Sequence, residues 1–168
     1  MPREVRTPPW RRGPEPSRHN RGVSKNHARR RTAITSTSPC PCGLGRPYGE
    51  CCGSFHRGRA SAPTAERLMR SRYSAFAVGD VAYLLRTWHP STRPAALDLE
   101  PEQHWTRLEI LGSTGGSAFH NEGTVAFRAH FVLGGYEDSQ YENSRFVRDG
   151  GQWVYLDALP DTGPTSGG

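Results

Sequence analysis

The stretch Cys40-Pro-Cys42-Gly-Leu-Gly-Arg-Pro-Tyr-Gly-Glu-Cys51-Cys52 decides how the first folded part of this 168-residue chain is built. All four cysteines of the sequence lie within these thirteen residues, in the pattern C-x-C-x8-C-C. Four soft thiolates this close together suit a tetrahedral Zn²⁺ ion. Because so short a stretch cannot bury a core, metal binding would supply its folding free energy. With all four ligands drawn from the protein, we expect a structural site and not a hydrolytic one.

Disulfide bonding is the less favoured interpretation of these cysteines. A secreted disulfide scaffold spreads its cysteines to connect distant segments, whereas Cys51 and Cys52 are adjacent and a bridge between them would be strained. The first 35 residues also lack the apolar stretch of a signal peptide. We therefore expect reduced, metal-bound cysteines in a cytoplasmic protein. Free or redox-active thiols are the alternative, and His56 is an alternative ligand.

The basic charge of the chain is concentrated at its N-terminus. Residues 1–32 contain ten Lys and Arg against two Glu, which gives this segment a net charge of +8. The whole chain carries +6, so the remaining residues carry −2. A near-neutral body argues against a basic nucleic-acid-binding globular domain. The Arg- and Pro-rich segment lacks apolar periodicity, and we expect residues 1–37 to be disordered. Three interpretations stay open: a salt-sensitive RNA or ribosome tether, a tail without specific role, or an extension upstream of the true start.

The rest of the sequence predicts an α+β domain. An apolar face with helical spacing predicts a helix from Pro63 to Phe76, with Pro63 or Thr64 at its start. Gly79-Asp80 breaks this helix and can cap a second one from Val81 to Trp88. Alternating patterns predict four strands, near 107–110, 125–131, 141–148 and 153–157, with hairpin turns at Gly134-Gly135 and Asp149-Gly150. No apolar run is long enough to span a membrane. Helices laid across one face of a curved antiparallel sheet form a cone, which resembles the nuclear-transport-factor-2-like fold.

The cysteine stretch resembles the SEC-C motif, a zinc knuckle found in the preprotein translocase SecA and in many small bacterial proteins. The residues that match are Cys40, Cys42, Gly45, Tyr48, Cys51 and Cys52. The chain departs from the motif at Leu44 and Arg46, neither of which is a ligand. Some members have His at the position of Cys52, so the resemblance implies that Cys52, and not His56, is the fourth ligand. In SecA the similar knuckle contacts a chaperone and other surfaces, which implies an interaction role with Gly43–Glu50 as the contact loop and with Arg46 and Tyr48 exposed on it.

A wider resemblance covers residues 38–158. After the knuckle, the segments that carry it are Leu68-Met-Arg-Ser-Arg-Tyr-Ser-Ala-Phe76, Tyr83-Leu-Leu-Arg-Thr-Trp88-His-Pro, Ser91-Thr-Arg93, Ser144-Arg-Phe146 and Trp153-Val-Tyr155. They are similar to the YchJ-like family of bacterial proteins, which indicates architecture more than activity. The expected organisation is a disordered tail (1–37), a zinc knuckle (38–58), a nuclear-transport-factor-2-like domain (60–159) and a disordered C-terminus (160–168). Exposed sheets of this fold often dimerise, so a homodimer is a further expectation.

The interior of the cone is a second candidate site. The residues expected to line it are Arg72, Tyr73, Trp88, His89, Glu142 and Ser144. Such a pocket would suit a small polar or anionic ligand, and a buried carboxylate can act as a base. The structural alternative is an internal ion pair between Arg72 and Glu142 among ordinary core residues, with His89 closing a helix.

Three functions therefore compete. The first is a zinc-bearing adaptor that binds a protein partner, the second is a ligand-binding or isomerase- or hydratase-like protein that uses the cone, and the third is RNA or ribosome association through the tail. The near-neutral body ranks the third last.

Overall fold

The structure is a computed structural model that describes residues 33–160. The segments expected to be disordered, 1–37 and 160–168, lie outside the described residues except for 33–37 and 160. Within that part, the backbone N–H of Gly49 donates to the carbonyl oxygen of Ser36 at 2.8 Å. The chain therefore contacts the knuckle slightly before the expected boundary at residue 38. None of the helices in residues 33–160 has the length and apolar character of a membrane span.

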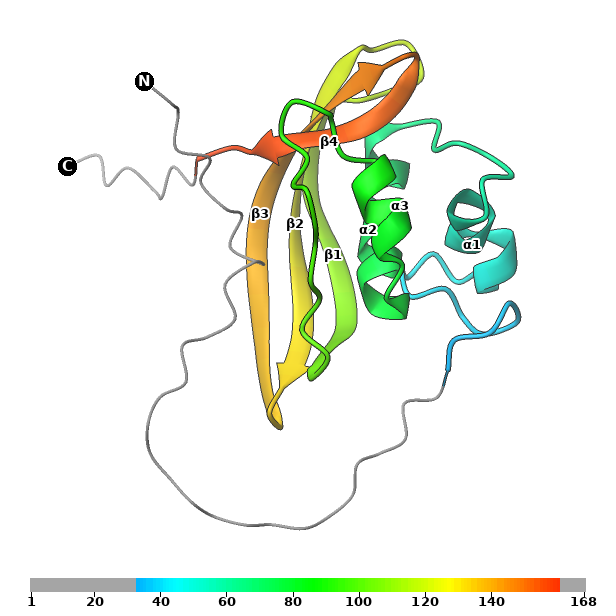
Figure 1. Cartoon of the computed structure of the whole chain (residues 1–168), viewed down its shortest axis with the longest axis vertical. Coiled ribbons are helices and arrows are strands. Elements are labelled where there is room, and N and C mark those ends of the chain that lie inside the picture. The colour runs from blue at the N-terminus through cyan, green and yellow to red at the C-terminus, as the bar shows by residue number, and fades with distance from the viewer. Residues whose placement is uncertain (1–32, 161–168) are drawn as a thin grey trace, which may run out of the picture.

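The fold has three layers, which Figure 1 shows side by side. An antiparallel sheet with strand order β1-β2-β3-β4 forms the first, and the helices α2 and α3 cover one of its faces. The cysteine segment with α1 packs against α2 from the other side. The elements are η2 (Tyr48–Glu50), α1 (Cys52–His56), α2 (Ala65–Val78), α3 (Val81–Arg86), β1 (Gln103–Gly115), β2 (Glu122–Leu133), β3 (Tyr136–Asp149) and β4 (Gln152–Ala158).

The helix α2 is the middle layer, and local signals set both of its ends. At its start, the Thr64 hydroxyl oxygen accepts a hydrogen bond from the backbone N–H of Arg67 at 3.2 Å. At its end, Gly79 adopts a φ of 80°, a left-handed conformation that favours glycine. Asp80 then caps α3, which ends at Arg86, two residues before the expected Trp88.

The four predicted strands are confirmed, and they extend further than their apolar patterns indicated. The first hairpin turns at Gly134-Gly135, as expected. The second turns at Gly150-Gly151, one residue later than predicted, because both central positions have positive φ (58° and 83°), which glycine adopts without strain.

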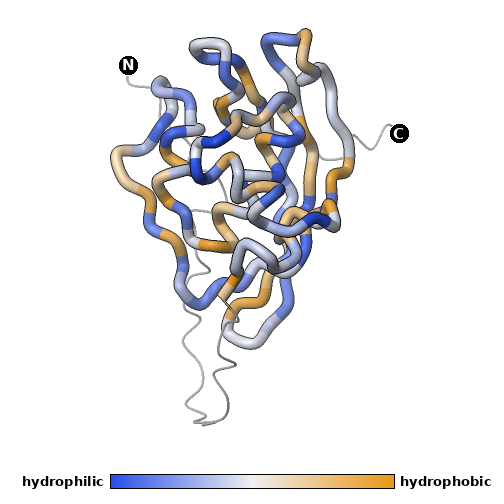
Figure 2. Tube along the Cα trace, turned by 90° about the vertical axis from the view of Figure 1, so that its right-hand side faces the viewer, coloured by the Kyte–Doolittle hydropathy of each residue, from blue (hydrophilic) through white to orange (hydrophobic). Residues whose placement is uncertain are grey.

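The core lies between the sheet and the helices. Buried positions alternate with more exposed ones along β2 and along the second half of β3. Figure 2 shows apolar and polar residues interspersed along the trace of the described part of the chain. Glu142, Ser144 and Phe146 share the buried face, as the alternation predicted. The core cluster includes Leu68, Tyr73, Leu84, Trp88, Val125, Phe127, Phe146, Trp153 and Tyr155.

Replacing Gly123 by Ala should destabilise the fold more than the same change at Gly112. A Cβ at Gly123 would lie 2.5 Å from the Cα of Gly116 and 2.9 Å from the carbonyl oxygen of Thr114, so backbone must move. A Cβ at Gly112 meets nothing within 4 Å. In urea denaturation we expect Gly123→Ala to lose about 1–3 kcal/mol of unfolding free energy and Gly112→Ala to be unchanged or slightly more stable. Equal effects of the two substitutions would contradict this packing.

Candidate functional site

The four cysteines converge on one point. The Sγ atoms of Cys40, Cys42, Cys51 and Cys52 all lie within 4.8 Å of one another, and all four residues are buried. The Sγ atoms of Cys42 and Cys51 are 3.6 Å apart. Four sulfurs bound at ~2.3 Å to one tetrahedral ion stand roughly 3.8 Å from each other. The spacing therefore fits a single metal ion held by all four residues.

The electrostatics of the cluster also favour a cation among the sulfurs. The hydrogen bond with Cys40 raises the pKa of both the Cys42 and the Cys52 thiols, and burial raises them further. A second or third thiolate beside the first is thus unfavourable unless a positive charge screens it. A divalent ion supplies that charge and takes the place of the thiol protons.

His56 is not directed at the cluster. Its Nε2 lies 2.8 Å from the carbonyl oxygen of Ser71, which can only accept, so Nε2 carries the proton. Its Nδ1 then accepts from the Tyr48 hydroxyl at 2.6 Å. Burial lowers the pKa of His56, which favours this neutral form. With both ring nitrogens engaged, His56 ties the knuckle to α2 and does not serve as the alternative ligand.

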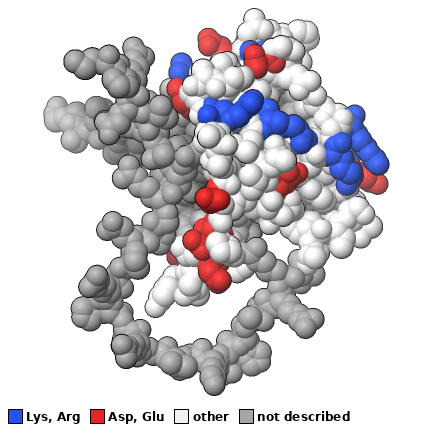
Figure 3. Space-filling model, viewed as in Figure 1, with Lys and Arg blue, Asp and Glu red and all other residues white. Residues whose placement is uncertain are grey.

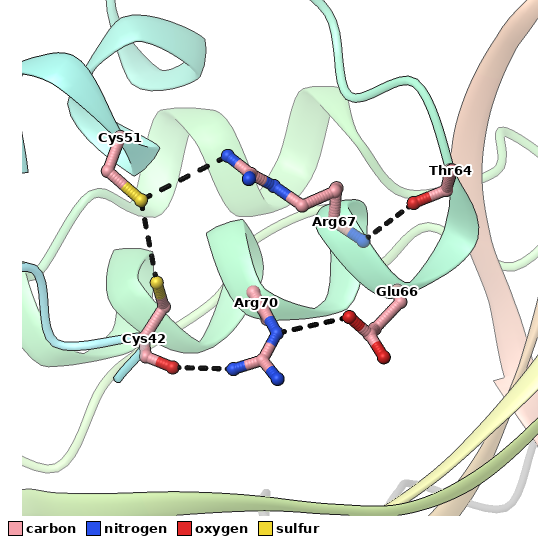
Figure 4. A network of polar contacts seen from close by, with 6 residues as sticks. All are labelled: Cys42, Cys51, Thr64, Glu66, Arg67 and Arg70. Carbon is pink, nitrogen blue, oxygen red and sulfur yellow. Dashed lines mark hydrogen bonds and ion pairs between the residues drawn. The ribbon is translucent and has the colours of Figure 1, made fainter. Parts of the chain in front are cut away.

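Side chains of α2 surround the cysteine cluster on the side that faces the sheet layer. A nitrogen of the Arg67 guanidinium lies 4.0 Å from Cys51 Sγ, the outer limit for an N–H···S hydrogen bond. Arg70 donates to the carbonyl oxygen of Cys42 at 2.8 Å and pairs with Glu66. Figure 4 shows both arginines reaching from one helix towards the two cysteines. On the same side, Ser74 Oγ lies 3.6 Å from Cys40 Sγ.

Sequence reasoning missed these contacts for an identifiable reason. Arg67, Arg70, Ser71 and Ser74 follow helical spacing on the face of α2 away from the sheet. Such a polar stripe is typical of a solvated face. Here it faces the knuckle instead, and both serines are fully buried. The signal available in the sequence was a pair of serines among the arginines of this stripe, which suits a helix packed against thiolates.

The cone interior is almost filled by the protein's own side chains. The cavity between α2 and the sheet has a volume of about 30 Å³. Since a water molecule needs roughly 10–15 Å³ measured in this way, the cavity holds a water molecule or two and not a ligand. Four of the candidate pocket residues line it: Arg72, Tyr73, Glu142 and Ser144.

Arg72 and Glu142 belong to a buried polar chain that includes Tyr155, a residue that sequence reasoning did not single out. Arg72 donates to Leu84 O at 2.8 Å and Thr87 Oγ1 at 2.7 Å, and its guanidinium lies over the Tyr155 ring. The Tyr155 hydroxyl donates to Glu142 Oε1 at 2.9 Å. Burial lowers the pKa of Arg72 to about 10, with Tyr155, Tyr83 and Glu142 opposing the shift.

Ser144 Oγ also donates to Glu142 Oε1, at 2.8 Å. The arrangement joins α2, α3, β3 and β4, and it favours the structural interpretation of these residues.

The remaining two candidates lie apart from this cavity. Trp88 is buried under the Arg72 guanidinium and packs edge-on against Tyr155. His89 follows α3, where its backbone N–H donates to Tyr155 O at 2.7 Å. Its Nδ1 accepts from the Ser91 N–H at 3.0 Å. The helix α3 is thus closed by its C-cap Thr87 and not by His89, which instead joins the turn after the helix to β4.

Comparisons with known proteins agree with both parts of this architecture. A family model described as the YchJ middle NTF2-like domain matches residues 64–158, and a SEC-C motif model matches residues 37–54. A UPF0225 protein of Streptomyces coelicolor is 62% identical over 121 residues, covering 72% of this chain and 94% of that protein. One from Deinococcus radiodurans is 48% identical over 120 residues, covering 71% of this chain and 88% of that protein.

Two solved structures share the fold. The solution structure of a SEC-C motif containing protein from Rhodopseudomonas palustris is 35% identical, with a TM-score of 0.63 over 71% of this chain and 96% of that one. The crystal structure of a SEC-C motif containing protein from Psychrobacter arcticus is 28% identical, with a TM-score of 0.61 over 73% of this chain and 82% of that one.

Replacing Arg67 by Gln should speed up metal release from the cysteine cluster. Four thiolates and a divalent ion carry a net charge of −2. The change removes the guanidinium beside Cys51, which compensates part of this negative charge. Outer contacts of this kind contribute tenfold or more to metal affinity. We expect about tenfold faster Zn²⁺ transfer to a chromogenic chelator.

The matched control is Arg59→Gln, because Arg59 is an exposed arginine that follows α1 and lies outside the cysteine segment. Arg67→Lys, which keeps the charge, should fall between wild type and Arg67→Gln. Release from Arg67→Gln at the rate of Arg59→Gln would show that Arg67 plays no part in holding the metal.

Proposed function

Since the chain belongs to the YchJ-like (UPF0225) family and carries its SEC-C motif, we propose that it is a zinc-binding adaptor whose knuckle contacts a protein partner. The observation that carries the proposal is the closed set of four buried sulfurs. Every position of a tetrahedral Zn²⁺ ion is then taken by the protein, and none is left for water or substrate. Such an ion supplies folding free energy and shapes a surface.

The surface that the metal would shape is the loop between the two cysteine pairs. Both ends of the loop are tied to the cluster, and the backbone N–H of Cys40 donates to Arg46 O at 2.9 Å. Gly43 and Gly45 have φ of 83° and 76°, which turns the loop tightly. At its tip Leu44 is 38% exposed, beside the exposed Arg46. Tyr48, which was also expected to be exposed, is half-buried instead, because it packs against the cysteines and its hydroxyl hydrogen-bonds to His56. A rigid apolar and cationic tip loses little entropy on binding, which favours a protein contact.

The cone supports this assignment indirectly. With about 30 Å³ of free space, it offers no room for the small molecule that a ligand carrier or an isomerase-like enzyme would hold. We place the partner contact in the knuckle for that reason.

The metal identity is tested by native mass spectrometry of the full chain. We expect one Zn²⁺ per chain, and Cys51→Ser should reduce this occupancy strongly because it removes one of four ligands. Ser54→Ala, in the same short helix α1, serves as the control and should keep its metal. Wild-type protein that is free of metal, or that carries a different ion, would overturn the zinc assignment.

The partner contact is tested by site-specific photo-crosslinking in cells. A photoreactive residue at position 44 should give a discrete cross-linked protein species. The matched control is position 111 on β1, where Leu111 is also exposed (52%) but far along the chain from the knuckle. The band from position 44 should disappear in the Cys51→Ser background. The same bands from positions 44 and 111, or none from position 44, would refute an interaction role for the knuckle.

A further inference from the structure

A second hollow lies outside the cone and is much larger than the cavity within it. It forms where α2 ends at Val78, where α3 begins at Val81, and where the segment 97–101 passes beside the start of β1. Its volume is about 410 Å³. Cavities that bind small molecules measure about 300–1,000 Å³. We call it the 97–101 hollow after the segment that forms its outer wall.

The walls of the 97–101 hollow combine apolar side chains with polar groups. Phe76, Val78, Val81, Leu99 and Trp105 all line it, and each is only half-buried. Apolar side chains that remain in contact with water while they converge on one concave surface are typical of a binding site. Burying these five surfaces would release bound water, so the hydrophobic effect favours an occupant.

The charge of the hollow selects the sign of that occupant. Asp98 and Glu100 line it and are exposed, and no Lys or Arg is among its lining residues within the part of the chain that the structure describes. Figure 3 shows acidic side chains without basic neighbours at the lower end of the face in view, while both signs of charge occur towards the top and the right. Carboxylates without a competing cation form short, charge-assisted hydrogen bonds with an ammonium group.

Trp105 fixes one wall of the hollow rigidly. Its ring packs edge-on against Tyr73 and Phe131, with centroids 6.1 and 5.3 Å away, and lies 5.9 Å from the Phe76 ring. Trp105 and Phe76 also line the small cavity of the cone, so they separate the two spaces. Aromatic rings that are held in place in this way attract cations through their faces.

We propose that the 97–101 hollow binds a small organic amine with an apolar body. The ammonium group pairs with Asp98 and Glu100, and the apolar body packs against Phe76, Val81 and Trp105. This function is independent of the knuckle and of its metal, and no residue of the cysteine cluster contributes to it.

The test uses three probes that share a phenyl body and differ in their head group: 2-phenylethylamine, 2-phenylethanol and 3-phenylpropionate. Binding to the full chain is followed by tryptophan fluorescence, because Trp105 lines the hollow. We expect the amine to saturate at millimolar concentrations or below and to bind at least about tenfold more tightly than the carboxylate. The signal should be lost in Trp105→Phe, while binding itself is followed in that variant by calorimetry.

Two charge-neutralising variants decide whether the acidic residues select the ligand. Asp98→Asn/Glu100→Gln should lower the affinity for the amine by about tenfold and leave the affinity for phenylethanol unchanged. The control Glu122→Gln/Asp149→Asn removes two exposed carboxylates at the other end of the sheet and should leave all three probes unchanged. Equal affinity for the three probes, no saturation at millimolar concentration, or the same effect of both double variants would overturn the proposal.

Discussion

The burial of α2 on two opposite sides is the constraint on which the rest of the structure depends. Towards the sheet it places Met69, Tyr73 and Arg72 in the core, and towards the knuckle it buries Ser71 and Ser74 completely. Where a second layer packs closely against a helix, a long polar side chain leaves space or unpaired groups unless it finds a partner in that layer, as Arg70 does at Cys42 O. Small hydroxyl side chains solve this problem, because they let another layer approach closely: Ser71 Oγ donates to Leu68 O within the helix, and Ser74 Oγ lies 3.6 Å from Cys40 Sγ in the knuckle.

Because α2 is shared, the knuckle and the sheet domain are not independent modules in this chain. The knuckle is held by Arg67 and Arg70 at its cysteines, and by His56, which donates to Ser71 O at 2.8 Å. From the body, Arg86 of α3 donates to the carbonyl oxygens of Phe55 and His56. Binding of a metal to the cysteines therefore stabilises the position of α2, and the folded domain in turn favours the geometry of the thiolates. By linkage, whatever strengthens one of these equilibria strengthens the other.

The sequence was most informative where a local rule has no competitor. Cysteine spacing, the Thr64 and Gly79 ends of α2, and the alternation along β2 each reflect chemistry within a few residues, and the structure agrees with them. The cone interior was harder to predict. Arg72 and Glu142 could either line a pocket or fill it, and the outcome depends on the volume of Tyr155, a residue of β4 that is distant in sequence. The polar stripe of α2 was equally ambiguous, since hydropathy cannot distinguish water from a layer of thiolates as its neighbour.

The position of α2 also explains why the two proposed binding sites, the knuckle tip and the 97–101 hollow, lie outside the cone. Buried hydrogen bonds join Arg72 to Thr87 and Tyr155 to Glu142, and the Arg72 guanidinium lies over the Tyr155 ring between them. Opening the cone would leave several of these groups unpaired. Each such group costs about 1–3 kcal/mol when buried without a partner, so the filled state is strongly favoured. The knuckle tip and the 97–101 hollow carry no comparable penalty, since their polar groups already face water. Both proposed binding sites are therefore surfaces that the filled domain holds in position.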